Sequence, residues 1–527
     1  MRPAFLFVVL AIGAGASAPS QQTLRNIVDS GTLAELRWPS FSRIQPDVAR
    51  FYESNGYQLA WVRNGSATPQ ALDLIHVLQD ATFKGLDPED YDVSRWNDRI
   101  AHLGTDADAI HFDLALTISA MRYISDVSYG KVDPAIFSFG FHFDQKKCDL
   151  ADAARQIASA GDVAADLRRL EPPFEGYWRA QSALARYTAL AQQDADPNPG
   201  AQLEPFLRLV GDLRAGDTLA YAIKHFQTRH GIEPDGRIGK ATLKQLNTPL
   251  SARVRQLQLV LERWRWVPHS FPRPPIVVNI PEFRLRAYDD QYHPKLEMKV
   301  VVGKEYRHKT PVFSSEMTHV IFRPYWEVPL SIQRAELVPK IAKDPGYLAK
   351  NDYEVVNFRR EVVASNSAGA DMVERLRAGK LFIRQVPGDK NALGYVKFLF
   401  PNQYNVYLHD TPSKSLFLKS RRDFSHGCIR VEKPELLAQW VLRGLDGWDM
   451  ERIEDAEHET VSRRVNLEKP IPVLVVYGTA VVKESGEVYF LDDIYGHDAE
   501  LQEMLDHGYP YSGWQPTSAV PDRRPRG

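Results

Sequence analysis

The sequence predicts a multidomain α+β protein, with helical domains in its N-terminal half and a β-rich domain in its C-terminal half. The chain has 527 residues, more than one hydrophobic core usually holds, so several domains are expected. Apolar residues recur at helical spacing up to about residue 265, and with a period of two from about residue 274. This change of period separates a helical part from a sheet-forming part.

The two ends of the chain are expected to lie outside these domains. Residues 1–18 carry an arginine, then an apolar run and small residues, which is typical of a secretory signal peptide cleaved after Ala16 or Ala18. The apolar run is shorter than the ~20 residues that cross a bilayer, and an uncleaved anchor is the alternative. Residues 512–527 are polar and rich in proline and arginine, and we expect them to be disordered.

The first folded part, residues 20–200, is predicted to be a helical scaffold domain. Apolar side chains fall at near-helical spacing over residues 69–82 and 113–124. Its aromatic residues are most simply core, because no catalytic set of side chains accompanies them. A stretch rich in aspartate, proline and glutamine, residues 192–200, indicates a linker.

A smaller unit of three helices is predicted over residues 203–265. Leu219, Ile223 and Phe226 lie at positions i, i+4 and i+7, which places them on one face of a helix. Pro234–Gly236 forms a turn before the next helix. The unit is small, and its sequence gives no catalytic residues.

Residues 274–500 are predicted to form one β-rich domain. Alternating apolar residues bounded by turn residues predict strands at 275–280, 283–288, 297–302 and 317–322. Residues 331–380 are charged, and we expect a helical insertion there that acts as a lid. Further strands are expected from Leu381 to His409, and a strand at 470–482 with a hairpin partner at 486–494 is expected to complete the domain.

Cys428 is the candidate nucleophile of this domain, in the sequence FSHGCIR. His409 ends a predicted strand upstream, and a polar loop separates it from the cysteine. A free thiol has a pKa near ~8.5, so an imidazole that takes the proton increases the reactive fraction at neutral pH. Gly427 lets the backbone turn tightly and brings amide N–H groups near the sulfur, where they can hold an oxyanion. The pattern predicts a Cys/His acyl-transfer site.

The sequences YLHDTP, at residues 407–412, and FSHGCIR resemble the signature of L,D-transpeptidases with a YkuD-type catalytic domain. RQVPG and NALG, at residues 384–388 and 391–394, followed by Lys397 and Phe398, extend the resemblance to the large periplasmic subtype, which has a scaffold region and a peptidoglycan-binding module. FQTRHGIEPDGRIGKATLKQLN, at residues 226–247, resembles that module. A helical spacer that binds nothing is the alternative for this segment.

The resemblance implies roles for single residues. Cys428 would be the acyl-accepting nucleophile and His409 its base, oriented by the carbonyl group of Asp410. The other matched positions are those of the oxyanion pocket, His426 and Gly427, and those near the substrate, Tyr407, Ser425, Arg430 and Trp326. The chain departs from the subtype at Glu327, where an asparagine is usual.

The function implied by this resemblance is that of a periplasmic, wall-associated L,D-transpeptidase. Its donor would be a tetrapeptide stem of peptidoglycan and its acceptor the amine of a diamino acid, which gives 3→3 cross-links in cell wall biogenesis and cell shape. Carbapenems would acylate the cysteine, and no metal or organic cofactor is required. The alternatives are hydrolysis of the same bond, by an L,D-carboxypeptidase or endopeptidase, and a non-catalytic peptidoglycan-binding protein.

Composition and residue spacing also bear on binding partners, membrane spans, disulfides and metal sites. A net charge of −2 gives no reason to expect nucleic acid or an anionic membrane as a partner, and no segment beyond the leader is apolar enough to span a membrane. Two cysteines exclude a disulfide scaffold, and Cys148 has no assigned role. A zinc site of His409, His426 and Cys428 is disfavoured, since His426 and Cys428 are two residues apart and no CxxC or HExxH motif accompanies them.

Overall fold

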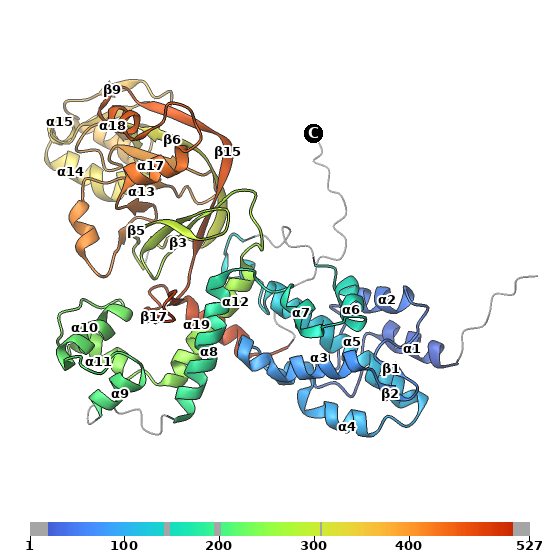
Figure 1. The fold of residues 1–527 in the computed structure, drawn as a ribbon. Helices are drawn as coiled ribbons and strands as arrows, with labels where there is room; N and C mark the ends of the chain where they lie inside the picture. Colours follow the sequence, from blue (N-terminus) through green and yellow to red (C-terminus); the bar gives the residue numbers. More distant parts are fainter. Residues whose placement is uncertain (1–18, 142–147, 194–201, 306–307, 510–527) are drawn as a thin grey trace, which may run out of the picture. The chain divides into compact units, whose positions relative to one another are not determined.

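The computed structural model describes residues 19–141, 148–193, 202–305 and 308–509. They belong to two compact units, one within Met1–Lys131, Lys146–Pro172 and His507–Gly527, the other within Val132–Gln145 and Pro173–Asp506 (Figure 1). The predicted signal peptide and C-terminal tail lie outside the described residues, as does most of the predicted linker. The two units are described separately below.

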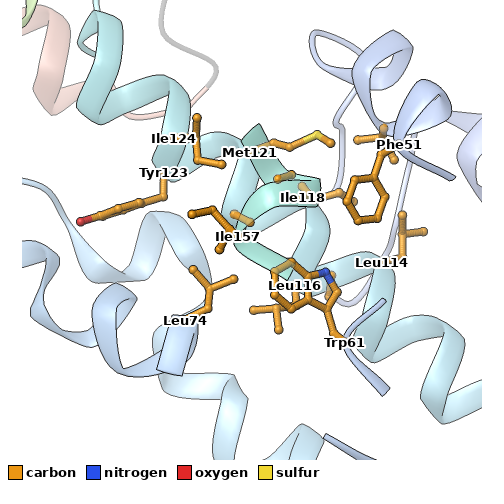
Figure 2. Packing of buried hydrophobic residues seen from close by; sticks show 14 of the residues in the cluster. Phe51, Trp61, Leu74, Leu114, Leu116, Ile118, Met121, Tyr123, Ile124 and Ile157 are labelled. Atoms are coloured by element: carbon orange, nitrogen blue, oxygen red, sulfur yellow. The ribbon is translucent and has the colours of Figure 1, made fainter. Parts of the chain in front are cut away.

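The first unit is helical, as its spacing of apolar residues predicts. Its elements are α1 (Pro19–Ser30), α2 (Gln45–Glu53), β1 (Val62–Arg63), β2 (Ser66–Ala67), α3 (Pro69–Gln79), η1 (Asp80–Lys84), η2 (Pro88–Tyr91), η3 (Val93–Arg95), α4 (Trp96–Ala101), α5 (Asp106–Tyr129), α6 (Leu150–Ala158) and α7 (Val163–Arg168). Thr105 and Asp108 start α5 with a reciprocal capping box. Side chains from several of these elements, among them Phe51, Trp61 and Leu74, meet around α5 in one core (Figure 2).

A buried polar cluster fixes the centre of this unit. The Asp113 carboxylate accepts hydrogen bonds from the Tyr52 hydroxyl, at 2.7 Å, and from the Trp61 amide, at 2.6 Å. Thr117 Oγ1 accepts one from the Trp61 indole at 2.9 Å. Burial raises the pKa of Asp113 to about 7. Each of these polar groups is engaged with another, so the cluster orders the core.

The second unit begins with helices. They are η4 (Pro134–Phe137), α8 (Glu175–Gln193), α9 (Leu203–Leu209), α10 (Leu219–Arg229), α11 (Lys240–Leu246) and α12 (Leu250–Trp266), and α19 (His497–Asp506) follows near its end. Helices α9, α10 and α11 enclose a small core that includes Phe226 and Leu246. Helix α12 instead packs along α8 through Leu257 and Leu261 (Figure 1). The predicted three-helix unit therefore consists of α9–α11, and the last predicted helix belongs to another core.

The largest sheet that the described residues of this unit form has nine strands. They are β3 (Ile276–Asn279), β4 (Arg284–Tyr288), β5 (Pro294–Gly303), β6 (Phe313–Phe322), β11 (Val396–Leu399), β12 (Leu408–His409), β13 (Asp423–Ser425), β14 (Ile429–Val431) and β15 (Arg463–Val476). Their order is β13-β5-β14-β12-β11-β6-β15-β3-β4, and a further pairing of β4 with β5 closes the sheet on itself. Helices α17 (Pro434–Leu442) and α18 (Met450–His458) follow β14 in the chain. The strands predicted between residues 275 and 322 are all present.

The predicted C-terminal strand pair is arranged differently from our expectation. The strand predicted at 470–482 begins inside β15, but its end forms a separate hairpin of β16 (Ala480–Val482) and β17 (Val488–Phe490). Val488 and Phe490 are buried with residues of α8 and α12. The hairpin therefore extends the helical core instead of the nine-stranded sheet.

An inserted subdomain, which we call the cap (residues 326–385), interrupts the sheet. Its elements are β7 (Trp326–Glu327), α13 (Leu330–Ile332), the π-helical turn η6 (Gln333–Leu337), α14 (Val338–Lys343), α15 (Tyr347–Lys350), β8 (Tyr353–Val356), β9 (Val362–Ala364), α16 (Ala370–Arg377) and β10 (Phe382–Gln385). The four strands form their own sheet in the order β7-β10-β8-β9. The insertion expected to be helical over 331–380 is thus helical only in part. Its short apolar run at Tyr353–Val356 pairs as a strand, and β10 joins the cap rather than the main sheet.

Candidate active site

Two neighbouring strands bring His409 and Cys428 to one region of the sheet. Strand β12 pairs in parallel with β14, so that Leu408 faces Ile429 and His409 faces Arg430. Cys428 directly precedes β14, and the Ile429 amide donates a hydrogen bond to the Tyr407 carbonyl at 3.1 Å. The 3₁₀ helix η7 (Lys414–Leu418) and strand β13 lie in the connection between the two strands.

The turn that presents Cys428 is held from inside. Gly427 has φ of +115°, a conformation that favours glycine. The buried Ser425 hydroxyl accepts a hydrogen bond from the Gly427 amide at 3.1 Å and donates one to the Cys428 carbonyl at 2.6 Å. The Thr310 hydroxyl donates to the Gly427 carbonyl at 2.8 Å. Ser425, which was expected near the substrate, is buried in this turn, and the Gly427 amide, expected near the oxyanion, donates to the Ser425 hydroxyl.

His409 is oriented by the residue that follows it. Its Nδ1 lies 2.5 Å from the Asp410 carbonyl oxygen, and because a carbonyl only accepts, Nδ1 carries the proton. The lone pair is then on Nε2, the atom that a general base needs. The imidazole is only 4% exposed, and burial together with the Arg430 cation lowers the pKa of His409 to about 3. His409 is therefore neutral at physiological pH.

The Asp410 carboxylate anchors this arrangement in the sheet. It pairs with Lys414 at 2.6 Å and accepts a hydrogen bond from the Tyr395 amide at 2.9 Å. Gly394, with φ of +60°, passes so close that a Cβ there would lie 2.1 Å from an Asp410 oxygen. The carbonyl of Asp410 thus orients the base, while its carboxylate fixes the backbone that leads into β11.

The Cys428 thiol is partly buried, and burial raises its pKa above the usual range. Its sulfur lies 3.8 Å from the Asn405 carbonyl oxygen. Tyr407 and the Lys397 and Arg430 cations act in the opposite direction and limit this rise in the pKa of Cys428. The free site therefore holds a neutral thiol beside a neutral imidazole.

Tyr407 links the nucleophile to the cap. Its ring lies 5.7 Å from the His409 ring in an edge-on arrangement, and the Trp326 side chain on β7 is close enough to act on its pKa. The Lys397 ammonium group lies 3.9 Å from the centre of the Tyr407 ring, a close cation–π contact. Burial raises the pKa of Tyr407 well above its ordinary value, so the hydroxyl stays protonated.

His426 points to the cap. Its Nε2 lies 2.6 Å from a carboxylate oxygen of Glu336 in η6, and its ring lies 4.7 Å from the ring of His308. The expected place of His426 in the oxyanion pocket is not tested by this contact, which engages one of its two ring nitrogens. The Cys428 amide makes no hydrogen bond to a described residue, so it remains the candidate oxyanion donor in this turn.

Arg430 and Lys397 are cations at this site without a carboxylate partner in the described chain. Nε of Arg430 is buried and makes no hydrogen bond. Sequence reasoning assigned a role to Arg430 but none to Lys397, Glu336 or Gly394. Lys397 alternates with the buried residues of β11, as a residue on the other face of a strand does, and it and Gly394 lie in segments that extend the family resemblance. The roles of Glu336 and Gly394 could not be assigned from the sequence, because they depend on contacts with distant residues.

The remaining predictions about the site concern the second cysteine, metals and membrane spans. Cys148 is a free thiol in the first unit, and burial raises its pKa to about 11. Among the described residues, no group of three or more His, Cys, Asp or Glu side chains is arranged to hold a metal ion. The helices in that part of the chain are all too short or too polar to cross a membrane.

Comparison with known protein families assigns this site to one of three matched segments. Residues 46–184 match a scaffold domain, residues 206–246 a "putative peptidoglycan binding domain", and residues 273–465 an L,D-transpeptidase catalytic domain of the YkuD family. The last match contains Cys428 and His409.

A curated relative supports the same assignment. A protein of Haemophilus influenzae named "Putative L,D-transpeptidase" is 35% identical over 228 residues, which is 43% of this chain. The match covers 45% of the relative, so the chain aligns with about half of its length. The matched segments and this relative show that the chain carries a YkuD-type L,D-transpeptidase catalytic domain behind a scaffold domain and a peptidoglycan-binding domain.

Proposed function

We propose that the chain is a cysteine-dependent L,D-transpeptidase that forms 3→3 cross-links between peptidoglycan stem peptides. The observation that carries the proposal is the pair of parallel strands β12 and β14, which holds an oriented, neutral imidazole in the strand next to Cys428. The family of residues 273–465 supplies the reaction class. The substrate and the product linkage are parts of the proposal.

In the first half-reaction His409 Nε2 takes the thiol proton of Cys428 while the sulfur attacks the carbonyl carbon of the donor. The amide that breaks joins the diamino acid at the third position of a tetrapeptide stem to the terminal D-residue. The Cys428 amide donates to the oxyanion. His409 then gives the proton to the departing amine, and a thioester remains on Cys428.

In the second half-reaction the side-chain amine of a neighbouring stem attacks the thioester. His409 takes a proton from this amine, the carbon–sulfur bond breaks, and the thiolate regains a proton. The neutral imidazole suits both steps, because it can accept a proton in one and return it in the other. A low pKa makes His409 a weak base in the free protein, so we expect the developing thiolate–imidazolium pair to be stabilised by the bound substrate.

Peptidoglycan is the proposed partner of the binding domain as well. The domain at residues 206–246 would retain the protein on the wall, and secretion through residues 1–18 would place it in the periplasm. Acylation by carbapenems follows from the same nucleophile.

Analysis of muropeptide products tests the proposal. Purified protein is incubated with tetrapeptide-stem muropeptides, and products are resolved by mass, with Cys428→Ala as the control. Cross-linked dimers with loss of a D-residue are expected from the wild type alone. Tripeptide monomers without dimers would identify a hydrolase, and no change together with no carbapenem adduct on Cys428 would identify a non-catalytic wall-binding protein.

A further inference from the structure

Three basic side chains stand in a row across the main sheet. Lys397 on β11 faces His409 on β12, and His409 faces Arg430 on β14. Residues paired in register project from the same face, and neighbouring strands are about 4.8 Å apart. Lys397 and Arg430 therefore flank the base, one on each side.

The two outer cations lack a carboxylate of their own among the described residues, and the charge that acts on both is that of the Cys428 thiolate. Neither forms a salt bridge with a described residue, and Nε of Arg430 is buried without an acceptor. Glu327 is the carboxylate that acts on Lys397, and it is already paired with Arg360. Both side chains are half-buried and therefore partly desolvated, and this burial lowers the pKa of Lys397 and of Arg430. Desolvated cations without counterions are costly to maintain, which points to an anionic ligand.

We propose that Lys397 and Arg430 form a carboxylate-binding site around His409, in which Lys397 holds the terminal carboxylate of the departing D-amino acid. This assignment rests on the proposed function. The departing nitrogen must reach His409 to receive its proton, and the terminal carboxylate is attached one carbon beyond that nitrogen. Lys397 stands on β11, which pairs with β12 on the edge opposite to β14, and its ammonium group acts on both His409 and Cys428, so a carboxylate attached next to the departing nitrogen would arrive within its reach.

Arg430, on the strand that follows Cys428, would bind a carboxylate on the acyl side of the broken bond. A diamino acid that carries a second carboxylate supplies such a group. Lys397 then binds the carboxylate on the leaving side of the broken bond, and Arg430 binds the carboxylate on the acyl side. The site therefore favours a donor peptide that ends one residue after the diamino acid. Tyr407 positions the lysine, because its ring lies beneath the ammonium group.

The test compares two donors and three proteins. The donors are a tetrapeptide-stem muropeptide with a free terminal carboxylate and the same compound as its terminal amide. The proteins are the wild type, Lys397→Met and the control Lys390→Met. Lys390 is an exposed lysine in the loop before β11, and its ammonium group donates a hydrogen bond to the Lys350 carbonyl at 2.9 Å. Release of the terminal D-residue gives kcat/KM for acylation.

Lys397→Met is expected to lower kcat/KM for the acid donor by ~10–100-fold, the loss typical of one charge-assisted hydrogen bond, and to change the amide donor by less than ~3-fold. Lys390→Met should match the wild type with both donors. An equal loss with both donors would mean that Lys397 acts on the thiol and would overturn the proposal, as would an unchanged rate with the acid.

Binding to the inactive protein separates this inference from the proposed reaction. In a Cys428→Ala background, Lys397→Met should weaken binding of the acid donor by ~10-fold or more and leave binding of the amide unchanged, as measured by calorimetry. If the wild type consumes neither donor but this difference is seen, the transfer reaction is refuted and the carboxylate site stands. If turnover is normal and the difference is missing, the carboxylate site is refuted alone.

Discussion

The proposed nucleophile, Cys428, and its proposed base, His409, are both uncharged in the free protein, and the reason lies in their immediate surroundings. Burial raises the pKa of Cys428, whereas burial and the Arg430 cation lower the pKa of His409 to about 3. Neither direction favours a resting thiolate–imidazolium pair. The expectation of a thiol acidified by the imidazole therefore changes: the proton is expected to move when the substrate arrives.

Alkylation of the thiols tests this protonation state. Because the pKa of Cys428 is raised, its thiolate fraction should grow about tenfold per pH unit through pH 8. The rate of reaction with iodoacetamide, followed by mass spectrometry of the Cys428 peptide, is expected to rise across this range without a plateau near pH 6. Cys148, with a pKa of about 11, is the internal control and should react more slowly. A plateau from pH 6 upward would reveal a resting ion pair.

Gly394 is predicted to be essential for the orientation of the base. A Cβ at this position would overlap the Asp410 carboxylate and would require a strained backbone, with φ of +60°. Gly394→Ala should cost about 1–3 kcal/mol of stability and lower kcat for acylation at least ~10-fold, because displacing Asp410 moves the carbonyl that holds His409. Thermal unfolding and D-residue release measure the two effects. Gly388→Ala is the matched control, since its Cβ meets no atom within 4 Å, and a similar loss in both variants would contradict the argument.

At the scale of elements, the cap and the nucleophile turn are joined by one polar contact. Glu336 stands on the π-helical turn η6 and reaches His426, two residues before Cys428. Single π-helical turns inside helices often occur at functional sites. Trp326 of the cap also lies close to Tyr407, so the cap approaches the candidate site from two of its elements.

Glu336→Ala is expected to release the cap while the sheet stays intact. The Michaelis constant for the tetrapeptide donor should rise ~3–30-fold, and amide hydrogen exchange in η6 and α13 should become faster, because the cap loses a tie to the turn. Glu374→Ala is the control, since Glu374 is exposed and pairs with Arg377 in its own helix α16. Unchanged saturation kinetics for Glu336→Ala would refute a role in closure.

At the scale of the second unit, the small peptidoglycan-binding domain is held by a buried ion pair. Arg229 on α10 pairs with Asp212 through Nε at 2.7 Å and donates to the Val488 carbonyl of β17 at 2.6 Å. Both side chains are almost completely buried. The hairpin β16–β17 thereby contacts α10 and packs on α8 and α12, which ties the domain to the helical core.

Arg229→Met is predicted to destabilise this domain by about 3–5 kcal/mol, because it leaves Asp212 buried without its cation. Hydrogen exchange over α9–α11 measures the loss, and co-sedimentation with isolated sacculi should fall in parallel. Arg214→Met is the matched control, since Arg214 makes an exposed pair with Glu487 and should cost less than about 1 kcal/mol. Sedimentation that survives a disordered α9–α11 would show that these helices are a spacer.

The sequence by itself predicted the order of the domains, the strands between residues 275 and 322, and the candidate pair Cys428 and His409. These depend on local periodicity and on a short motif, both of which are visible along the chain. The tertiary structure decided that the hairpin β16–β17 leaves the main sheet, that β10 joins the cap, and that Ser425 is used inside its own turn. It also decided that Lys397 stands beside the base. Pairing register and burial set these features, and both arise only when distant segments meet.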